Sequence, residues 1–398
     1  MDSAEREGLR PKGNVPNLRF PEFQGEWEKC KVSDLLDFYS TNSLSWDKLE
    51  YGTDAIQNLH YGLIHVGLPT MIDLSKDKLP NITNGNTPKN YELCQEGDIA
   101  FADASEDTNE VAKAVEFYKL NGKDVICGLH TIHGRDNQQK TVVGYKGYAF
   151  SSTAFHHQIR RIAQGTKIYS INSKNFSECY IGIPSKEEQK KIATLLRLID
   201  ERISTQNKII DKLQSLIKGI RNDVFGKLRK NIGFNAVVGD VLDYKQPQSY
   251  IVEDTEYTNE GTPVLTANKA FVLGYTLETD GIYDKGDCII FDDFTLDCKY
   301  VDFPFKVKSS AIKILTAKNK ELLRYAFEFL KYLDLSTEEH KRHYIAETQN
   351  QEFIMPTEQM VKTIAHIFST LSLRMETAVK QRDVFEKQKQ YLLRQMFI

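Results

Sequence analysis

The sequence IPSKEEQKKIA at residues 183–193 decides the fold of this chain, because a similar sequence, MPTEQMVKTIA, returns at residues 355–365. Each copy opens a long segment with helical periodicity, and the two segments end alike, in Val224-Phe225 and Met396-Phe397. Ser185 is a favourable N-cap for the first of these helices. A repeated block of this kind indicates a duplicated architecture. The sequence therefore predicts the order domain, long helix, domain, long helix.

Both long segments carry apolar residues at the alternating three- and four-residue spacing of a helix that packs on another helix. In the second segment Arg382 and Lys389 interrupt the pattern. Equal length, phase and flanks favour two helices that pack on each other over two helices that each pack on their own domain. The predicted seam consists of Ile192, Leu196, Ile199, Ile203, Ile210, Leu213, Ile217, Ile220, Ile364, Phe368, Leu371, Met375, Phe385 and Leu392.

The regions before the two helices echo each other more faintly. KVSDLLD at residues 31–37 is similar to VGDVLD at 238–243, and GDIAF at 97–101 is similar to GDCII at 286–290. A glycine-aspartate pair before a β-branched run is typical of a turn that leads into a strand. Both regions are therefore expected to fold as domains with short strands.

Composition bounds the class of protein. The 398 residues have room for two or three domains, and the net charge is −3. No apolar run is long enough for a membrane span, and the first residues lack the apolar core of a secretory signal. The six cysteines are far apart and form no CxxC pair, so we expect buried thiols in a reducing cytoplasm and no metal site.

Two motifs identify a family resemblance. NVPNLRFPEF at residues 14–23, followed by Gly25-Glu26-Trp27, and IPSKEEQKKIA at 183–193 resemble the start and the central helix of the specificity subunits of Type I restriction–modification systems. The resemblance covers nearly the whole chain and implies an α+β fold. Two α/β target-recognition domains would lie at opposite ends of an antiparallel coiled coil, with a pseudo-twofold internal repeat. The implied parts are an N-terminal arm (1–28), recognition domain 1 (29–184), a central conserved helix (185–228), recognition domain 2 (229–355) and a C-terminal conserved helix (356–398).

The same resemblance implies the function and the partners. Each recognition domain would read one half of a bipartite double-stranded DNA target, while the helices would set the spacing and dock two methyltransferase subunits. The full cytoplasmic complex would add two restriction/translocase subunits. S-adenosylmethionine, ATP and Mg²⁺ would then be bound by the partners, and this chain would need no cofactor. The shorter acidic opening at residues 355–359 leaves open whether both helices meet the methyltransferase in the same way.

The sequence itself offers no catalytic motif. It contains no Pro-Pro pair of the kind that holds a flipped adenine, no GxxxxGK[ST] phosphate loop and no glycine-rich dinucleotide loop. We therefore expect a non-catalytic chain. The charge is also uneven, because residues 186–230 hold 12 basic and 6 acidic residues and the domains are acidic overall. A DNA-reading role would require the basic residues of the domains to gather on one face, or a partner to neutralise phosphates.

Candidate DNA contacts are polar and basic side chains on turns, because these groups reach base edges and phosphates. The segments 133–140, 160–161, 165–170, 266–269 and 340–344 offer such groups. The candidates are Arg135, Lys140, Arg160, Arg161, Lys167, Tyr169, Asn268, Lys269, Lys341, Arg342 and His343.

Two alternative functions stay open at this point. Asp297-Cys298-Lys299, with Asp292 or Asp293 upstream, matches part of a metal-dependent nuclease motif, so the chain could be a stand-alone nuclease with a dimerising helix. It could also be a coiled-coil interaction protein that does not bind DNA. The histidine pairs at 130/133 and 156/157 are interpreted as ordinary loop or core residues, because no third ligand stands nearby in the sequence.

Overall fold

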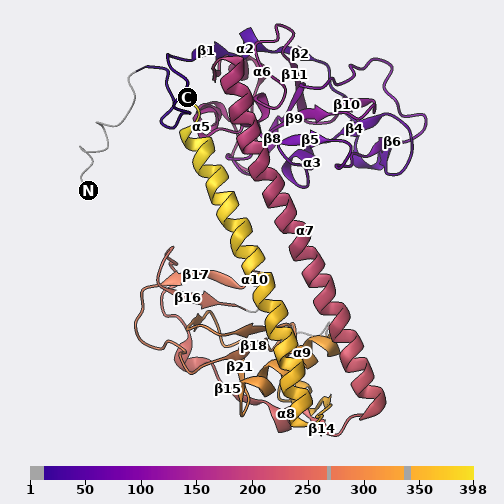
Figure 1. Ribbon diagram of the computed structural model, residues 1–398, viewed down its shortest axis with the longest axis vertical. Helices are drawn as coiled ribbons and strands as arrows, with labels where there is room; N and C mark the ends of the chain where they lie inside the picture. The colour runs from indigo at the N-terminus through magenta and orange to yellow at the C-terminus, as the bar shows by residue number, and fades with distance from the viewer. Residues whose placement is uncertain (1–12, 267–269, 336–341) are drawn as a thin grey trace. The chain divides into compact units, whose positions relative to one another are not determined.

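The computed structural model describes residues 13–266, 270–335 and 342–398, which form two compact units (Figure 1). The first unit contains Met1–Gln206 and Gln381–Ile398, and the second contains Asn207–Lys380. The two long helices, α7 (Lys186–Asn231) and α10 (Glu358–Gln395), each contribute one half to each unit. Among the described residues, no helix is both long and apolar enough to span a membrane.

The first unit is built on two sheets of mixed strand direction. A five-stranded sheet has the order β2-β11-β7-β9-β5, and a four-stranded sheet has the order β10-β4-β6-β3. Two-stranded pairs, β1-β13 and β12-β8, complete it. The strands are β1 (Glu28–Lys31), β2 (Asp37–Tyr39), β3 (Leu49–Glu50), β4 (Gln57–Leu59), β5 (Met71–Asp73), β6 (Asn81–Ile82), β7 (Ile99–Ala102), β8 (Ala104–Ser105), β9 (Ala114–Lys119), β10 (Val125–Cys127), β11 (Thr131–Arg135), β12 (Tyr169–Ser170) and β13 (Tyr180–Ile183). The short helices are α2 (Val32–Leu35), α3 (Tyr61–His65), α4 (Lys146–Phe150), α5 (Thr153–Ile162) and α6 (Ser173–Ser177).

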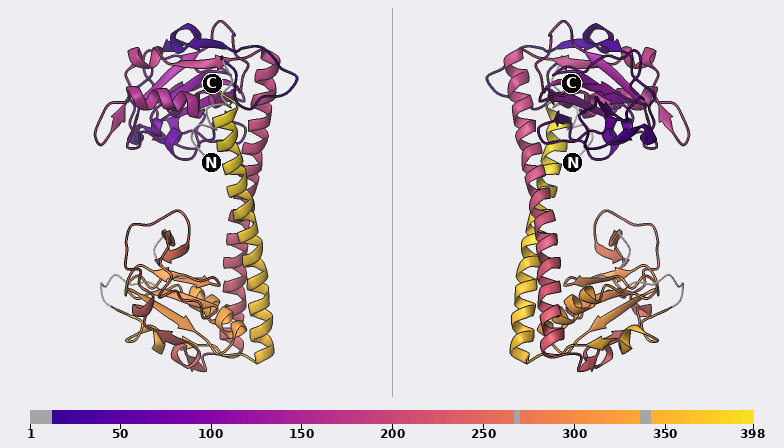
Figure 2. Two further views of the ribbon diagram at one scale, coloured as in Figure 1. Left: turned by 90° about the vertical axis from the view of Figure 1, so that its left-hand side faces the viewer. Right: turned by 90° about the vertical axis from the view of Figure 1, so that its right-hand side faces the viewer.

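The core of the first unit includes the far end of the chain. Ile192 and Leu196 of α7 pack in one apolar cluster with Leu392 of α10 and with Phe397 beyond it. The ring of Phe397 lies edge-on to Trp27, with ring centroids 6.4 Å apart. In both views of Figure 2 the yellow end of α10 accordingly lies against the first unit. Burial of these side chains by α10 makes residues 381–398 part of the first domain's core.

The second unit also contains two sheets, each with fewer strands than its counterpart in the first unit. A four-stranded sheet has the order β15-β21-β18-β19, and a three-stranded sheet has the order β17-β16-β20. The strands are β14 (Ala236–Val237), β15 (Asp243–Lys245), β16 (Thr262–Leu265), β17 (Val272–Thr276), β18 (Cys288–Asp292), β19 (Cys298–Val301), β20 (Lys306–Val307), β21 (Ile312–Thr316) and β22 (Glu352–Phe353). The helices besides α7 and α10 are α8 (Val238–Val241) and α9 (Lys320–Leu333), and α9 carries an Asn319 N-cap. Phe225 of α7 and Phe368 of α10 share an apolar cluster with Phe329 of α9.

The two units share their strand order where the sequence echoes itself. The order β2-β11-β7 in the first unit corresponds to β15-β21-β18 in the second, with antiparallel pairing throughout. The echoed segments form α2 and α8, and the echoed glycine-aspartate pairs precede β7 and β18. Each long helix follows the second strand of a two-stranded antiparallel pair: α7 follows β13, which pairs with β1, and α10 follows β22, which pairs with β14. Short sequence echoes therefore mark equivalent elements.

The starts of the two long helices differ in their side-chain contacts. Arg19 donates two hydrogen bonds to the buried carboxylate of Glu188, at 2.7 and 2.8 Å, and so ties the N-terminal segment to α7. Gln189 is also buried, accepts a hydrogen bond from the amide of Val142 and donates to the carbonyl of Pro184. The repeat places Met360 and Val361 at the matching positions of α10. The start of α10 therefore lacks the hydrogen bonds that Glu188 and Gln189 make at the start of α7.

Candidate nucleic-acid interface

Two neighbouring arginines lie exposed at the C-terminal end of α5. The helix begins after Ser152, whose hydroxyl accepts a hydrogen bond from the amide of Phe155. In the last turn of α5, Arg160 donates a 3.2 Å hydrogen bond to the side chain of Asn109, and Arg161 is exposed. The ring of His156 is largely buried on the same helix. Burial and the charge of Arg160 lower the pKa of His156, which favours its neutral form.

The loop that follows α5 carries two further candidates. Lys167 is exposed, and Tyr169 begins β12, which pairs antiparallel with β8. Gly165 has φ +140°, and a Cβ there would lie 1.9 Å from the carbonyl oxygen of Ile168. Only glycine can make this turn without displacing the backbone. The turn leaves Ile168 63% exposed, beside Lys167.

A cavity of about 600 Å³ lies next to this loop, and sequence reasoning missed it. Aromatic and basic side chains line it together with three acidic residues. The ring of Tyr61 lies edge-on to those of His65 and His130 at centroid distances of 5.9 and 5.2 Å. The lining residues are Tyr61, His65, Val66, Ala104, Ser105, Glu106, Asp107, Glu110, Lys113, His130 and Ile168. Aromatic rings beside a basic loop are able to stack on bases and to contact phosphates.

The structure places Arg135 inside the first domain. The first residues of the predicted loop 133–140 form the end of strand β11. The Arg135 guanidinium binds Asp98 at 2.8 and 2.9 Å and Glu92 at 2.6 Å. Hydrogen bonding to Asp98 is the main reason that the pKa of Arg135 is raised. Arg135 is therefore bound within the domain and is not among the residues that we propose for DNA. Lys140 is partly exposed, and its ammonium lies 3.6 Å from Glu28.

The second domain offers fewer described candidates. Asn268, Lys269 and Lys341 lie outside the described residues. Arg342 is half exposed and donates a 3.2 Å hydrogen bond to the hydroxyl of Ser310. His343 is buried, and its Nδ1 lies 2.9 Å from Glu347. Arg342 thus lies at the surface, whereas the side chain of His343 belongs to the interior.

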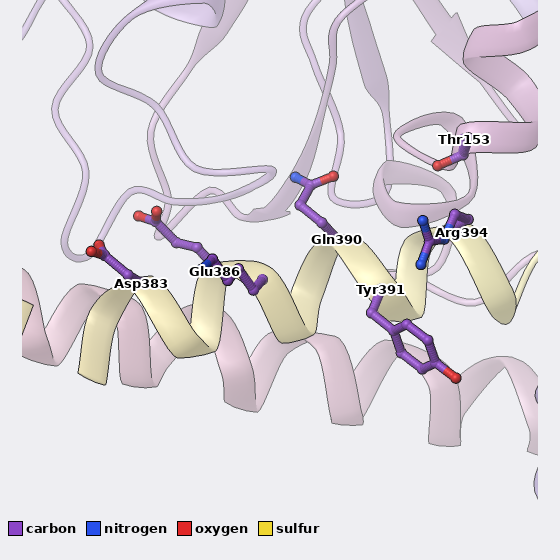
Figure 3. A pocket seen from close by; sticks show the side chains of 7 residues that line it. Thr153, Asp383, Glu386, Gln390, Tyr391 and Arg394 are labelled. Carbon is purple, nitrogen blue, oxygen red and sulfur yellow. The ribbon is translucent and has the colours of Figure 1, made fainter. Parts of the chain in front are cut away.

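A surface hollow beside the end of α10 is a separate feature of the first unit. Figure 3 shows Gln390 and Arg394 directed from α10 towards the domain, with Thr153 opposite and Tyr391 on the other side of the helix. Tyr391 is 49% exposed. Residues of both charges line the hollow, so it does not form a surface of one sign: Thr153, Asp383, Glu386, Lys387, Gln390, Tyr391 and Arg394.

Comparison with known proteins identifies the first domain. Residues 78–215 match the family described as Type I restriction modification DNA specificity domain. The specificity subunit of the Escherichia coli Type I restriction enzyme EcoR124I/EcoR124II is 44% identical over 126 residues, which cover 30% of this chain and 31% of that protein. The chain therefore matches about a third of the length of that relative.

Two solved structures share the fold. The S subunit of a Type I restriction–modification system from M. genitalium is 16% identical, with a TM-score of 0.64 over 96% of this chain and 99% of that one. A chain from a structure described as the basis of complex assembly and conformational transition of the Type I system is 12% identical, with a TM-score of 0.51 over 92% and 96% of the two chains. The predicted resemblance is confirmed: residues 78–215 match the Type I restriction modification DNA specificity domain, and the E. coli relative and the M. genitalium structure to which the chain is similar are specificity subunits of Type I systems.

Proposed function

We propose that this chain is the DNA-sequence-reading subunit of a Type I restriction–modification complex. The match of residues 78–215 to a DNA specificity domain carries the proposal. In the first domain the reading surface would be the exposed end of α5, the loop at 165–170 and the adjoining aromatic cavity. Arg160, Arg161 and Lys167 would contact phosphates, since they are exposed cations without a buried carboxylate partner in the described structure.

The second domain would read the other half of a bipartite target. Its shared strand order with the first domain supports a duplicated reader in a pseudo-twofold arrangement. Arg342 is the described candidate contact in this domain, and Asn268, Lys269 and Lys341 remain candidates on the sequence alone. Two similar readers on one chain would suit two half-sites, because each DNA-binding module fixes its own short sequence.

The two long helices would pair as an antiparallel coiled coil and set the distance between half-sites. Contacts within each unit support this pairing. The start of α7 and the end of α10 share an apolar cluster that includes Leu196 and Leu392, and the end of α7 and the start of α10 share another that includes Phe225 and Ile364. The amide of Gln206 also donates a 3.1 Å hydrogen bond to Gln381.

Methyltransferase and restriction subunits would supply the chemistry. Two methyltransferase subunits would dock on the helices and bind S-adenosylmethionine, while two restriction/translocase subunits would bind ATP and Mg²⁺, all in the cytoplasm. The acidic net charge of the two domains supports these partners. A DNA-binding complex must neutralise many phosphates, and partner subunits would supply the basic residues that the domains lack.

The nuclease alternative is not favoured by the chemistry of its candidate carboxylates. Asp293 lies 3.4 Å from the buried ammonium of Lys313, and Asp297 lies 2.9 Å from the partly exposed ammonium of Lys331. Asp292 accepts hydrogen bonds from the amides of two residues in its own turn. These oxygens already have partners, whereas a nuclease needs carboxylates that converge on Mg²⁺.

Methylation mapping tests the proposed function. The chain should be co-expressed with its methyltransferase subunit in a host without other methylases, and the methylated motifs should be sequenced. We expect one bipartite motif that is absent when either chain is expressed alone. A motif that does not depend on this chain would overturn the proposal, as would Mg²⁺-dependent cleavage by the isolated chain that an Asp297→Ala/Lys299→Ala variant abolishes.

A further inference from the structure

Two cysteines that are far apart in sequence lie side by side in the interior of the first domain. Cys94 precedes β7 and Cys127 ends β10, and both are buried. Their sulfur atoms are 3.6 Å apart. This distance is too long for a disulfide bond of about 2.05 Å. It is close to the separation of about 3.8 Å between two sulfur atoms that bind one zinc ion tetrahedrally with bonds of about 2.3 Å.

A buried histidine joins the two thiols. His133 lies on β11, and its ligand atom and the two sulfur atoms all lie within 4.8 Å of one another. The side chain is fully buried, and Nε2 lies 2.7 Å from the carboxylate of Asp98. The other ring nitrogen, Nδ1, is buried without a hydrogen-bond partner. A buried polar atom without a partner costs free energy, so its presence here indicates a missing ligand.

The surroundings of His133 match those of a metal-binding histidine. Such a residue usually donates its second ring nitrogen to a carboxylate, which fixes the tautomer that leaves the other nitrogen free for the metal. Asp98 fills this role, and Arg135 holds the same carboxylate in place with two hydrogen bonds. The ion pair between Arg135 and Asp98 would therefore also orient His133 for the metal.

From this geometry we propose that Cys94, Cys127 and His133 Nδ1 bind a Zn²⁺ ion. Two thiolates and one neutral imidazole form a set of soft ligands that balances the charge of the ion. No fourth His, Cys, Asp or Glu joins the group among the described residues, so a water molecule or a neutral oxygen donor would complete the tetrahedron.

The ion would join the two sheets of the first domain. Cys127 belongs to the four-stranded sheet through β10, and His133 belongs to the five-stranded sheet through β11; both strands are labelled in Figure 1. Cys94 lies next to β10, because its amide donates a hydrogen bond to the carbonyl of Val125. Binding energy at such a site contributes directly to folding. The role would be structural, and it is independent of the proposed function.

Zinc content is the first test. The full chain should be purified without chelators and its metal measured by mass spectrometry. We expect about one zinc per chain, released when the thiols are titrated with a mercurial. Cys127→Ser should lose the zinc, whereas Cys179→Ser, which changes another buried thiol of the same domain, should retain it.

Cobalt substitution covers the case in which Cys127→Ser does not fold. The wild-type chain grown with Co²⁺ should show the thiolate-to-cobalt charge-transfer absorption and tetrahedral d–d bands. A wild-type chain that carries no zinc and takes up no cobalt would overturn the proposal. So would a count of two fewer free thiols in the denatured, unreduced chain without metal, because that result assigns a disulfide to the pair.

Discussion

At the scale of single residues, arginines of the first domain lie in opposite environments. Arg161 is exposed at the end of α5, whereas Arg135 is almost completely buried against Asp98. Both stand in polar segments of the sequence, so both were candidates for DNA contact. Sequence reasoning had no means to separate them, because the partner that buries Arg135 lies 37 positions away.

The first prediction concerns Arg161. We expect Arg161→Ala to weaken binding of the assembled complex to specific and non-specific DNA alike, and to reduce the slope of log affinity against log salt by about 1. A phosphate contact has these effects because it carries charge but no sequence information. Titrations of labelled DNA at several salt concentrations measure both quantities.

Lys89→Ala is the control for this prediction, because it removes an exposed cation from another segment of the same domain. It should leave affinity and salt slope unchanged. If Arg161→Ala instead lost discrimination at one position of the target sequence only, Arg161 would be assigned to base reading.

The second prediction concerns a buried carboxylate in the second unit. Glu328 of α9 is 1% exposed and binds Arg221 of α7 at 2.7 Å and Arg324 at 2.8 Å. Glu328→Gln leaves the buried guanidinium of Arg324 and the partly buried guanidinium of Arg221 without their counter-charge. We expect a loss of about 3–5 kcal/mol in the free energy of unfolding of the second unit, measured by urea denaturation.

Glu321→Gln makes the same chemical change at an exposed position of the same helix, and it should alter stability by less than about 0.5 kcal/mol. Equal effects of the two variants would show that the ion-pair group does not hold α9 to α7.

At the scale of elements, periodicity made the long helices predictable. Ile192, Leu196 and Ile199 are buried, as their spacing predicts, while Ile203 and Leu213 are only partly buried. The candidate zinc ligands, by contrast, could not be predicted from a local sequence pattern. Cys94, Cys127 and His133 lie on three separate segments without a spacing motif, so only the fold brings them together. Local patterns reveal helices, but a site built from distant strands needs the topology.

The third prediction belongs to the helices. Gln206 of α7 donates a hydrogen bond to Gln381 of α10, so insertions next to these two residues would lengthen both helices at matching positions. Seven residues inserted after Gln206 and seven before Gln381 preserve the heptad phase and add about 10 Å. If the pair sets the spacing, the gap between half-sites should grow by about three base pairs, at about 3.4 Å each, with unchanged half-site sequences. Methylome sequencing measures the gap.

A variant with the insertion in α7 alone provides the comparison, because it lengthens one helix without its partner and should impair methylation. A doubly lengthened chain that still methylates with the original gap would leave the helices with only a docking role.

At the scale of the whole molecule, the proposed function predicts that the two domains can be exchanged independently. The fourth prediction is that replacing residues 229–355 with the equivalent block of a related subunit changes one half-site and spares the other. The reason is that each domain has its own sheets and its own core. Mapping of methylated motifs decides it, and a swap that altered both half-sites together would contradict the model of two independent readers.

The contribution of residues 381–398 to the first domain has a consequence for biosynthesis. Phe397 and Leu392 are core residues of a domain whose other parts end at residue 206. A ribosome that adds about 5–20 residues per second needs roughly 10–40 s to make the remaining chain. During that interval the apolar side chains of α7 that α10 later covers stay open to solvent. The nascent protein is then most prone to aggregate, and a chaperone, or the proposed methyltransferase partner if it covers this stretch of α7, would raise the yield of folded protein.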